Sequence, residues 1–421
     1  MKFNLSEYLQ GVTEEELIEY VKKCGSFKDN LRIILVALLP LVIFSCQSLN
    51  MDIYTEACSS SYKINENHPI AEKLQEKLEE IVALDIPGAV IAIKDGSGTW
   101  AAAAGYAKTE DNVPMELCHL QFGQSVAKTY MATAILLLYQ EGEIDLDETI
   151  DTYLPDTLIK HIDNTQQATV RMLLNHTSGI AEYTNQPDFI DFYLRNPLHQ
   201  FEPMEFLTYI RHKPAYFKLS EGYKYVNSNY LLLALIADEI TGDHKTYIQE
   251  EILKKHGFNH TFYHTAGFME LAKLVNGYWH KYGNGKVENC SKMHRALVGT
   301  SIGDDGIIAT PLDYLSFIEK LMTNQILSEA TTAEMLNFIQ KKPNEPNGAG
   351  LGVHQTFYDG KPEIGHTGAG VGASCAMGYF PDSNTYFFIG YNLGTAYKPA
   401  FEKDYKKIRN EVFKLLLEER K

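Results

Sequence analysis

Residues 373–391 read ASCAMGYFPDSNTYFFIGY, and this stretch decides the fold. Two runs rich in aromatic and small apolar residues, Ala373 to Phe380 and Thr385 to Tyr391, flank the tetrapeptide Pro381-Asp-Ser-Asn384. Such runs favour β-strands, and Pro, Asp, Ser and Asn are typical of a turn between antiparallel strands. The stretch therefore predicts an antiparallel hairpin.

Further strand signals lie on both sides of the central part of the sequence. Leu351 to Phe357 and Glu363 to Thr367 flank Tyr358-Asp-Gly360, which is a turn signal. Near the other end, Gly88 to Gly96 and Thr99 to Tyr106 form a second predicted hairpin. The two ends of the chain therefore predict the strands of one antiparallel sheet.

Between these ends, from Ser125 to about Ala309, the sequence is mainly helical. Apolar residues at helical spacing predict helices at Ser125 to Gln140 and Tyr230 to Ile240. Two more helices, His68 to Leu84 and about Phe401 to Glu418, are expected to cover the sheet.

We therefore expect an α/β (α+β) fold, in which an antiparallel β-sheet is flanked by helices and carries a mainly helical insertion at about residues 142–300. The whole domain is expected to span residues 68–421. A cleft should form where the sheet and the insertion meet, which is a common place for an active site.

Gln124 to Lys128, QSVAK, places Ser125 and Lys128 three residues apart at the start of a predicted helix. Residues at this spacing share a helix face, so the lysine amine can reach the serine hydroxyl. Serine is a poor nucleophile without an adjacent base, and lysine acts as a base only when its pKa is lowered. The pattern predicts a nucleophilic serine, with an ordinary helix N-cap as the alternative.

Other short patterns point to no further chemistry. Ser60 to Lys63 also reads Ser-x-x-Lys, but it lies in a polar segment that no amphipathic helix follows. The glycines of Gly368 to Gly372 precede a strand rather than a helix, which argues against a phosphate loop. The acidic residues show no metal-binding pattern, so neither a metal nor a cofactor is expected.

Two motifs follow Ser125-x-x-Lys128 in the chain: Tyr225-Val226-Asn227 and His366-Thr367-Gly368. In this order the three resemble the motifs Ser-x-x-Lys, Tyr-x-Asn and Lys/His-Thr-Gly of the family of class C β-lactamases, D,D-carboxypeptidases and related esterases. The resemblance implies the β-lactamase/penicillin-binding-protein-like fold.

Supporting stretches also resemble this family, and the resemblance covers roughly residues 68–418. LLNHTSG at residues 173–179 and SIGDDGIIATPLD at residues 301–313 are examples, although Asp304 and Asp305 are unusual there. Several ordered motifs are more specific than any single one.

The resemblance implies that Ser125 is the nucleophile and that Lys128 and Tyr225 share the roles of general base and acid. Asn227 would help to hold Lys128 and the substrate. The alternative for Tyr225 is a core tyrosine, and His176 of the LLNHTSG stretch is better explained as a buried structural histidine.

The third motif supplies the substrate-binding edge in the same implied scheme. His366, Thr367 and Gly368 would lie on the strand that lines the cleft, and the backbone N–H groups of Ser125 and Ala369 would form the oxyanion hole. The alternative for His366 is a hydrogen-bonded histidine within a strand.

The charge and the cysteine spacing exclude some classes of partner and site. The net charge of −16 disfavours binding to phosphate backbones, so no nucleic acid is expected. The six cysteines are widely and irregularly spaced, which predicts neither a zinc site nor a disulfide framework.

The N-terminal residues 1–46 look like an atypical extension plus a lipoprotein-type signal. The apolar run from Ile33 to Ser45 is too short to span a bilayer as a helix. Ile43-Phe44-Ser45-Cys46 resembles a relaxed bacterial lipobox, which implies lipid attachment to Cys46, a membrane anchor and an extracytoplasmic domain. The alternatives are a buried helix or an anchor that is retained.

Two features adjoin that run. The preceding residues are acidic, with glutamates at positions 14, 15, 16 and 19, so translation is expected to start near Leu31. Residues 47–67 are polar and Ser-rich, which predicts a tether between anchor and domain.

The sequence therefore predicts a serine hydrolase that forms an acyl-enzyme on Ser125 and acts on a small-molecule or peptide substrate. Because neutral His366 would attract a carboxylate less than lysine, a D-alanyl peptide or small ester is favoured over a β-lactam. The alternatives are a class C-type β-lactamase and a non-catalytic surface lipoprotein that binds penicillin or peptidoglycan. The oligomeric state is not predicted.

Overall fold

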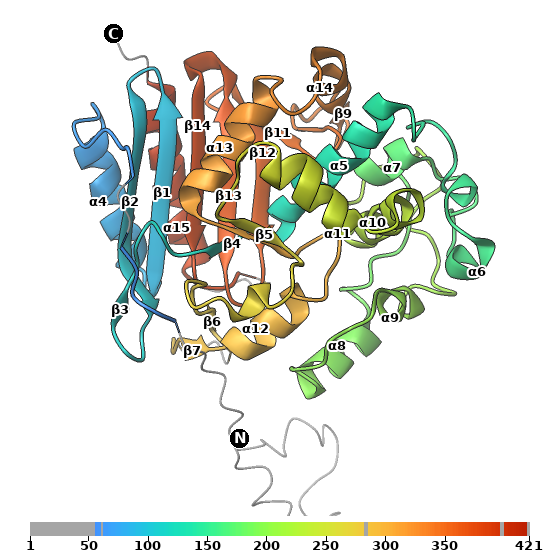
Figure 1. The fold of residues 1–421 in the computed structure, drawn as a ribbon, viewed down its shortest axis with the longest axis horizontal. Helices are drawn as coiled ribbons and strands as arrows, with labels where there is room; N and C mark the ends of the chain where they lie inside the picture. Colours follow the sequence, from blue (N-terminus) through green and yellow to red (C-terminus); the bar gives the residue numbers. More distant parts are fainter. Residues whose placement is uncertain (1–54, 60–61, 282–284, 396–399, 419–421) are drawn as a thin grey trace, which may run out of the picture. The chain divides into compact units, whose positions relative to one another are not determined.

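The computed structural model describes residues 55–59, 62–281, 285–395 and 400–418, all within one compact unit (Figure 1). The predicted signal, Cys46 and the first part of the predicted tether lie outside these residues, as does Ser60. No helix in the described part of the chain combines the length and apolar character needed to cross a bilayer.

A nine-stranded antiparallel sheet forms the centre of the molecule, in the order β3-β2-β1-β14-β13-β12-β11-β10-β9. Its strands are β1 (Gly88–Asp95), β2 (Gly98–Lys108), β3 (Val113–Pro114), β9 (Ile339–Gln340), β10 (Gly348–Ala349), β11 (His354–Tyr358), β12 (Lys361–Ala369), β13 (Ser374–Phe380) and β14 (Thr385–Tyr391). The two ends of the chain meet where β1 pairs with β14, with Ile91 opposite Ile389. The predicted sheet is confirmed.

The hairpin β13–β14 forms where the sequence predicts it. Its register places Phe380 opposite Thr385 and Ser374 opposite Tyr391. The connection is the short 3-10 turn η5 (Pro381–Ser383), followed by Asn384 with φ of +47°. Asparagine tolerates this left-handed conformation better than most residues, so the local sequence fixes the turn.

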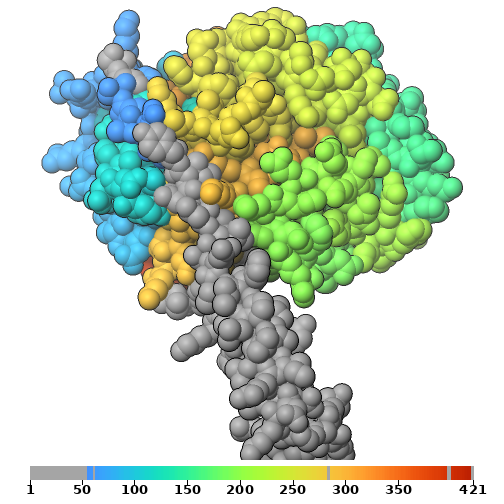
Figure 2. Space-filling model, turned by 60° about the horizontal axis from the view of Figure 1, so that its bottom comes forward, coloured from blue at the N-terminus to red at the C-terminus, as the bar shows by residue number. Residues whose placement is uncertain are grey.

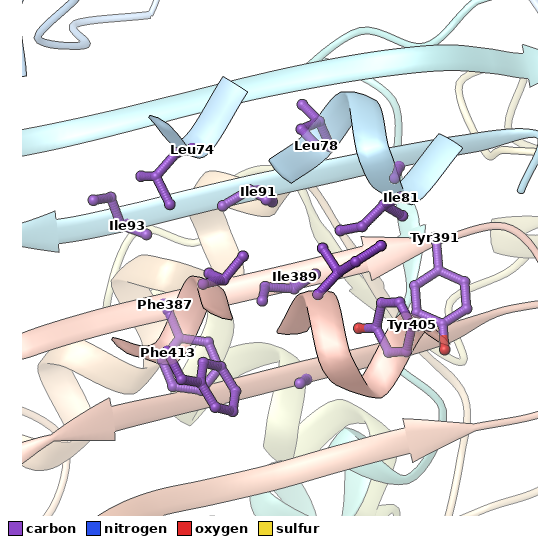
Figure 3. Packing of buried hydrophobic residues seen from close by; sticks show 14 of the residues in the cluster. Leu74, Leu78, Ile81, Ile91, Ile93, Phe387, Ile389, Tyr391, Tyr405 and Phe413 are labelled. Atoms are coloured by element: carbon purple, nitrogen blue, oxygen red, sulfur yellow. The ribbon is translucent and has the colours of Figure 1, made fainter. Parts of the chain in front are cut away.

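One face of the sheet is covered by the first and last described helices, α4 (Ala71–Val82) and α15 (Glu402–Leu417) (Figure 1). Their apolar sides pack with those of β1 and β14 in a single cluster (Figure 3). Full burial of one large aliphatic or aromatic side chain contributes roughly 1.5–3 kcal/mol. This cluster therefore supplies much of the free energy that holds the two ends of the chain together.

The opposite side carries α13 (Pro311–Met322), which contacts β1, β13 and β14, and the central part of the chain. The central helices are α5 (Ala127–Glu141), α6 (Asp156–Ile159), α7 (Val170–Leu174), α8 (Pro187–Arg195), α9 (Pro203–Thr208), α10 (Ser228–Thr241), α11 (His244–Tyr247), the π-helix η3 (Ile248–Lys254), α12 (Ser291–Val298) and α14 (Glu329–Met335). Short 3-10 turns are η1 (Gln124–Val126), η2 (Ile150–Thr152) and η4 (Phe268–Glu270).

Short strands that the sequence did not predict lie within the insertion and on either side of it. β8 (Ile307–Ala309) pairs with both β4 (Gln121–Phe122) and β5 (Thr261–Tyr263), and β6 (Tyr278–Trp279) pairs with β7 (Glu288–Asn289). Strands of two or three residues carry too little periodicity to be recognised. The pairing of β4 with β8 matters for function, because β4 ends just before η1.

Figure 2 shows a hollow on one face between the green part of the chain, which includes α8 and α9, and the yellow part. A cavity of about 410 Å³ lies there, with Leu198 on one side and Met269 and Ala272 on the other.

The described part of the predicted tether, residues 55–59 and 62–67, makes contacts with the domain. Thr55 is buried, and its hydroxyl donates to the Leu274 carbonyl at 3.1 Å. The Asn65 N–H donates to the Thr99 carbonyl at 2.6 Å. Isolated hydrogen bonds of this kind produce no pattern that can be recognised in a polar sequence.

A disulfide joins Cys58 to Cys118, which are 60 residues apart. It fixes the same N-terminal segment to the domain. The wide cysteine spacing gave no sign of this pair, because a disulfide depends on proximity in the fold.

Candidate active site

Ser125 lies in η1, directly before α5, so the predicted helix begins two residues later than expected. The preceding residue, Gln124, has φ of +48°, a conformation that non-glycine residues rarely adopt. The Lys128 amine lies 3.1 Å from the Ser125 hydroxyl oxygen. The structure thus places the amine within hydrogen-bonding distance of the hydroxyl, as the spacing predicts.

Lys128 is completely buried, and its amine also donates to the Asp304 carbonyl at 2.9 Å. Burial lowers the pKa of Lys128, because a low-polarity environment disfavours the ammonium form. The negative charge of Asp304 opposes this shift most strongly, followed by that of Asp305. A lysine whose pKa is lowered gives up its proton more readily than an ordinary lysine, which suits a general base beside Ser125.

Tyr225 completes the group. Its ring lies 5.2 Å from the Lys128 amine, and its buried hydroxyl has no partner with normal hydrogen-bond geometry among the described residues. Burial raises the pKa of Tyr225 well above its usual value, and the nearby Ser125 hydroxyl opposes that rise. The phenol is therefore neutral and can donate a proton. This favours Tyr225 as the acid and Lys128 as the base, rather than equal sharing of both roles.

Asn227 differs from the implied role. Its backbone N–H donates to one oxygen of the Glu182 carboxylate, and its side-chain amide donates to the other at 3.3 Å. No hydrogen bond from Asn227 to Lys128 occurs within the described residues. Glu182 thus acts as the partner of the second motif, and its distance of 45 residues from Asn227 hid this from sequence analysis.

His366 lies on β12, with its Nδ1 donating to the Thr367 carbonyl at 2.7 Å. Burial lowers the pKa of His366 to about 3, and the nearby positive charge of Lys128 adds to the shift. The imidazole is therefore neutral, and its ring lies 5.9 Å from that of Tyr225. Thr367 and Ala369 are exposed on the same strand.

Gly368 brings β12 against the serine turn. A Cβ atom at Gly368 would lie 2.4 Å from the Gly123 carbonyl oxygen, so only glycine permits this approach. The Cys375 thiol on β13 donates to the same carbonyl at 3.1 Å. The strand that carries Ala369 therefore packs against the turn that carries Ser125, which is the arrangement an oxyanion hole from these two residues requires.

Two further histidines surround Tyr225. His176 is buried, and its Nδ1 accepts from the Val226 N–H at 3.3 Å, which is a structural role. His354, which the sequence did not single out, stacks on His366 with ring centroids 4.8 Å apart. Burial lowers the pKa of both His176 and His354 well below the usual value.

Two adjacent carboxyl groups lie beneath Lys128. Burial raises the pKa of Asp304 and raises that of Asp305 to about 7, with the charge of Asp304 adding to the latter shift. Asp304 accepts a hydrogen bond from the Tyr183 hydroxyl at 2.9 Å. The unusual pair in the sequence is thus an acidic pair, with Asp304 buried and Asp305 partly buried, that acts on the pKa of Lys128.

One group of potential metal ligands occurs within the described residues, away from this site. It consists of Asp238, Asp243 and His244. The Asp238 carboxylate accepts from His244 at 2.7 Å, and Asp243 caps α11. Protein groups satisfy these side chains, which indicates a structural role.

Sequence comparison finds curated proteins that are similar to this chain. The chain is 24% identical over 359 residues to the putative penicillin-binding protein PbpX of Bacillus subtilis, covering 83% of this chain and 79% of the relative. It is 26% identical over 201 residues to protein flp of Staphylococcus aureus, covering 46% of this chain and only 39% of flp.

Solved structures share the fold. D-amino acid amidase from Ochrobactrum anthropi SV3 matches with a TM-score of 0.71 and 24% identity, over 82% of this chain and 98% of the amidase. A penicillin-binding protein from Bacillus halodurans matches with a TM-score of 0.68 and 21% identity, over 81% of this chain and 99% of that protein. The Beta-lactamase family model matches residues 73–408, so the chain belongs to the Beta-lactamase family of β-lactamase- and penicillin-binding-protein-like hydrolases.

Proposed function

We propose that this protein is a serine hydrolase that forms an acyl-enzyme on Ser125 and cleaves an amide or ester bond. The observation that carries the proposal is the buried Lys128 amine, 3.1 Å from the Ser125 hydroxyl oxygen, with its pKa lowered by burial. A D-alanyl peptide or a small ester suits the site better than a β-lactam, since neutral His366 replaces the lysine of the third motif.

In the proposed reaction, Lys128 takes the proton of Ser125 while the serine oxygen attacks the carbonyl carbon. The backbone N–H groups of Ser125 and Ala369 stabilise the resulting oxyanion. Tyr225, a neutral phenol, donates a proton to the leaving amine or alcohol as the carbon–leaving-group bond breaks, and Lys128 returns the proton to the tyrosinate. Water then attacks the acyl-enzyme, with the same groups acting in the reverse sense.

The test is intact mass spectrometry after incubation with a fluorophosphonate, a penicillin, simple esters and D-alanyl peptides. One covalent adduct per chain is expected, and Ser125→Ala should abolish it. Ser60→Ala is the matched control, because that serine belongs to the other Ser-x-x-Lys match, and it should label normally. An adduct that persists in Ser125→Ala places the nucleophile elsewhere.

Turnover separates the proposal from its alternatives. Hydrolysis of esters or D-alanyl peptides supports the proposed reaction, while rapid hydrolysis of penicillin favours a class C-type β-lactamase. Stable binding of these compounds without any turnover favours a non-catalytic binding lipoprotein.

We also propose that the domain is extracytoplasmic and anchored to a membrane through a lipid on Cys46. The Cys58–Cys118 disulfide supports an oxidising location, because structural disulfides are rare in the reducing cytosol. Cys46→Ala should release the protein from membranes of the native host. Native protein with an unmodified Met1 would refute the anchor.

A further inference from the structure

Gln124, the residue directly before Ser125, combines a strained backbone with a buried side chain. Its φ of +48° lies in the left-handed region that favours glycine, and the residue is only 1% exposed. A residue in this conformation costs free energy and persists only where the surrounding structure holds it. The contacts of the glutamine side chain therefore offset that cost, at the position that helps to set the direction of the Ser125 N–H group.

The Gln124 side chain reaches helix α12. Its amide nitrogen donates to Nε2 of His294 at 2.8 Å, and His294 is itself buried. Burial lowers the pKa of His294 to about 3, and the charge of Arg295 adds to the shift, so the imidazole is neutral and Nε2 can accept this hydrogen bond. The imidazole packs edge-on against Phe122, with ring centroids 4.4 Å apart. His294 thus holds the glutamine amide from a closely packed position.

The same side chain packs against the end of β12. A Cβ atom at Gly370 would overlap the Gln124 amide oxygen, and one at Gly368 would lie 2.8 Å from the Gln124 Cβ. Glycine at both positions permits this close approach. The two glycines flank Ala369, whose N–H group is one donor of the proposed oxyanion hole. Gln124 therefore lies between the strand that carries this donor and the helix that holds the amide.

The two donors of the proposed oxyanion hole belong to different elements, the serine turn and β12. An oxyanion hole is effective only when its donors are fixed in advance at the position of the developing charge. We propose that the Gln124–His294 pair is a positioning device for the oxyanion hole. It holds the N–H groups of Ser125 and Ala369 at the separation that the tetrahedral intermediate requires. This inference rests on the proposed serine hydrolase function.

The test replaces the glutamine by the residue that its backbone favours. Gln124→Gly in the full-length protein removes the amide and relieves the strain, so only the side-chain contacts are lost. The rate of Ser125 labelling by a fluorophosphonate and kcat for a small ester should each fall by about 10–100-fold, because misplaced donors stabilise the oxyanion poorly. Acylation and deacylation both pass through an oxyanion, so KM should change by less than about threefold. The pH midpoint of labelling should stay unchanged, since Lys128 is untouched.

A second variant tests the other half of the pair. His294→Phe keeps a ring beside Phe122 but removes the acceptor, so it should lower the labelling rate and kcat in the same way. The double variant should lose much less than the product of the two single effects, because the residues act as one unit. Thermal unfolding reports whether each variant folds, and His294→Phe carries the test if Gln124→Gly does not.

Asn112→Gly is the matched control. Asn112 also has a positive φ, of +54°, but it is exposed between β2 and β3. The same relief of strain there should leave labelling and turnover within about twofold of the unmodified protein. Equally small changes in folded Gln124→Gly and His294→Phe would overturn the positioning role and make the pair a packing contact. Absence of a Ser125 adduct in the unmodified protein would instead refute the proposed function, and this inference with it.

Discussion

The apolar cluster under α4 and α15 and the surroundings of the serine turn bury side chains of different character. Between the sheet and the helices α4 and α15, the buried cluster is apolar and includes Leu78, Ile389 and Phe413 (Figure 3). Around the serine turn, the buried residues include Lys128 and Asp304, which burial penalises. Burial of apolar groups stabilises the fold, whereas burial of ionisable groups costs free energy and shifts pKa values. The first region therefore holds the scaffold together, and the second contains the proposed catalytic residues.

The largest effects on activity should come from the site. Lys128→Ala and Tyr225→Phe should each lower kcat/KM by about 10²–10⁴-fold, the scale of lost general acid–base help. The double variant should lose much less than the product of the two, because the groups act as a unit. The measurement is kcat/KM for one ester and one D-alanyl peptide. Near-normal rates for Tyr225→Phe on both substrates would make Tyr225 a packing residue.

A substitution in the apolar cluster under α4 and α15 should instead lower stability and leave the pH dependence of activity unchanged. Phe413 is almost fully buried and packs against the rings of Tyr358, Phe380 and Phe387. Phe413→Ala should lower the free energy of unfolding by about 3–5 kcal/mol through the cavity it leaves. Denaturant unfolding measures this loss, and the pH profile of kcat/KM should keep its shape. A changed profile would mean that the two regions are coupled.

The pH dependence of unfolding tests whether ionised Asp305 in the site lowers the stability of the fold. The pKa of Asp305 is about 7 in the fold against about 3.9 for an ordinary aspartate, so the native state holds this proton more tightly than the unfolded chain. The free energy of unfolding should therefore fall as pH rises from about 4 to 7, by about 4 kcal/mol at most. Asp305→Asn should remove this dependence and stabilise the protein at neutral pH.

The control for this measurement is Asp382→Asn, at an exposed turn position, which should keep the pH dependence of the unmodified protein. A stability curve of Asp305→Asn that retains the same slope would assign the proton to another group.

The disulfide belongs to neither region, and its effect should be the smallest. Replacing Cys58 and Cys118 together by serine should lower the free energy of unfolding by about 2–4 kcal/mol, because the cross-link restricts the unfolded chain. Thermal unfolding with and without reductant measures this. The double variant should no longer respond to reductant, and a response that persists would contradict the assigned pair.

The sequence by itself determined the elements with strong local signals. The β13–β14 hairpin, α10 and the strands of β1 and β2 follow from periodicity and turn residues. The order of the three motifs likewise indicated the family. The three-residue spacing of Ser125 and Lys128 indicated that the two side chains are close, because residues three apart meet on one helical turn.

Only the tertiary structure decided which distant residues surround that pair. Asp304 reaches Lys128 across 176 residues, and Glu182 binds Asn227 across 45. The pairing of Cys58 with Cys118 and the hydrogen bond between Gln124 and His294 are of the same kind. Such contacts arise from the packing of whole elements and leave no periodic trace, so the charge environment of the site could be known only from the fold.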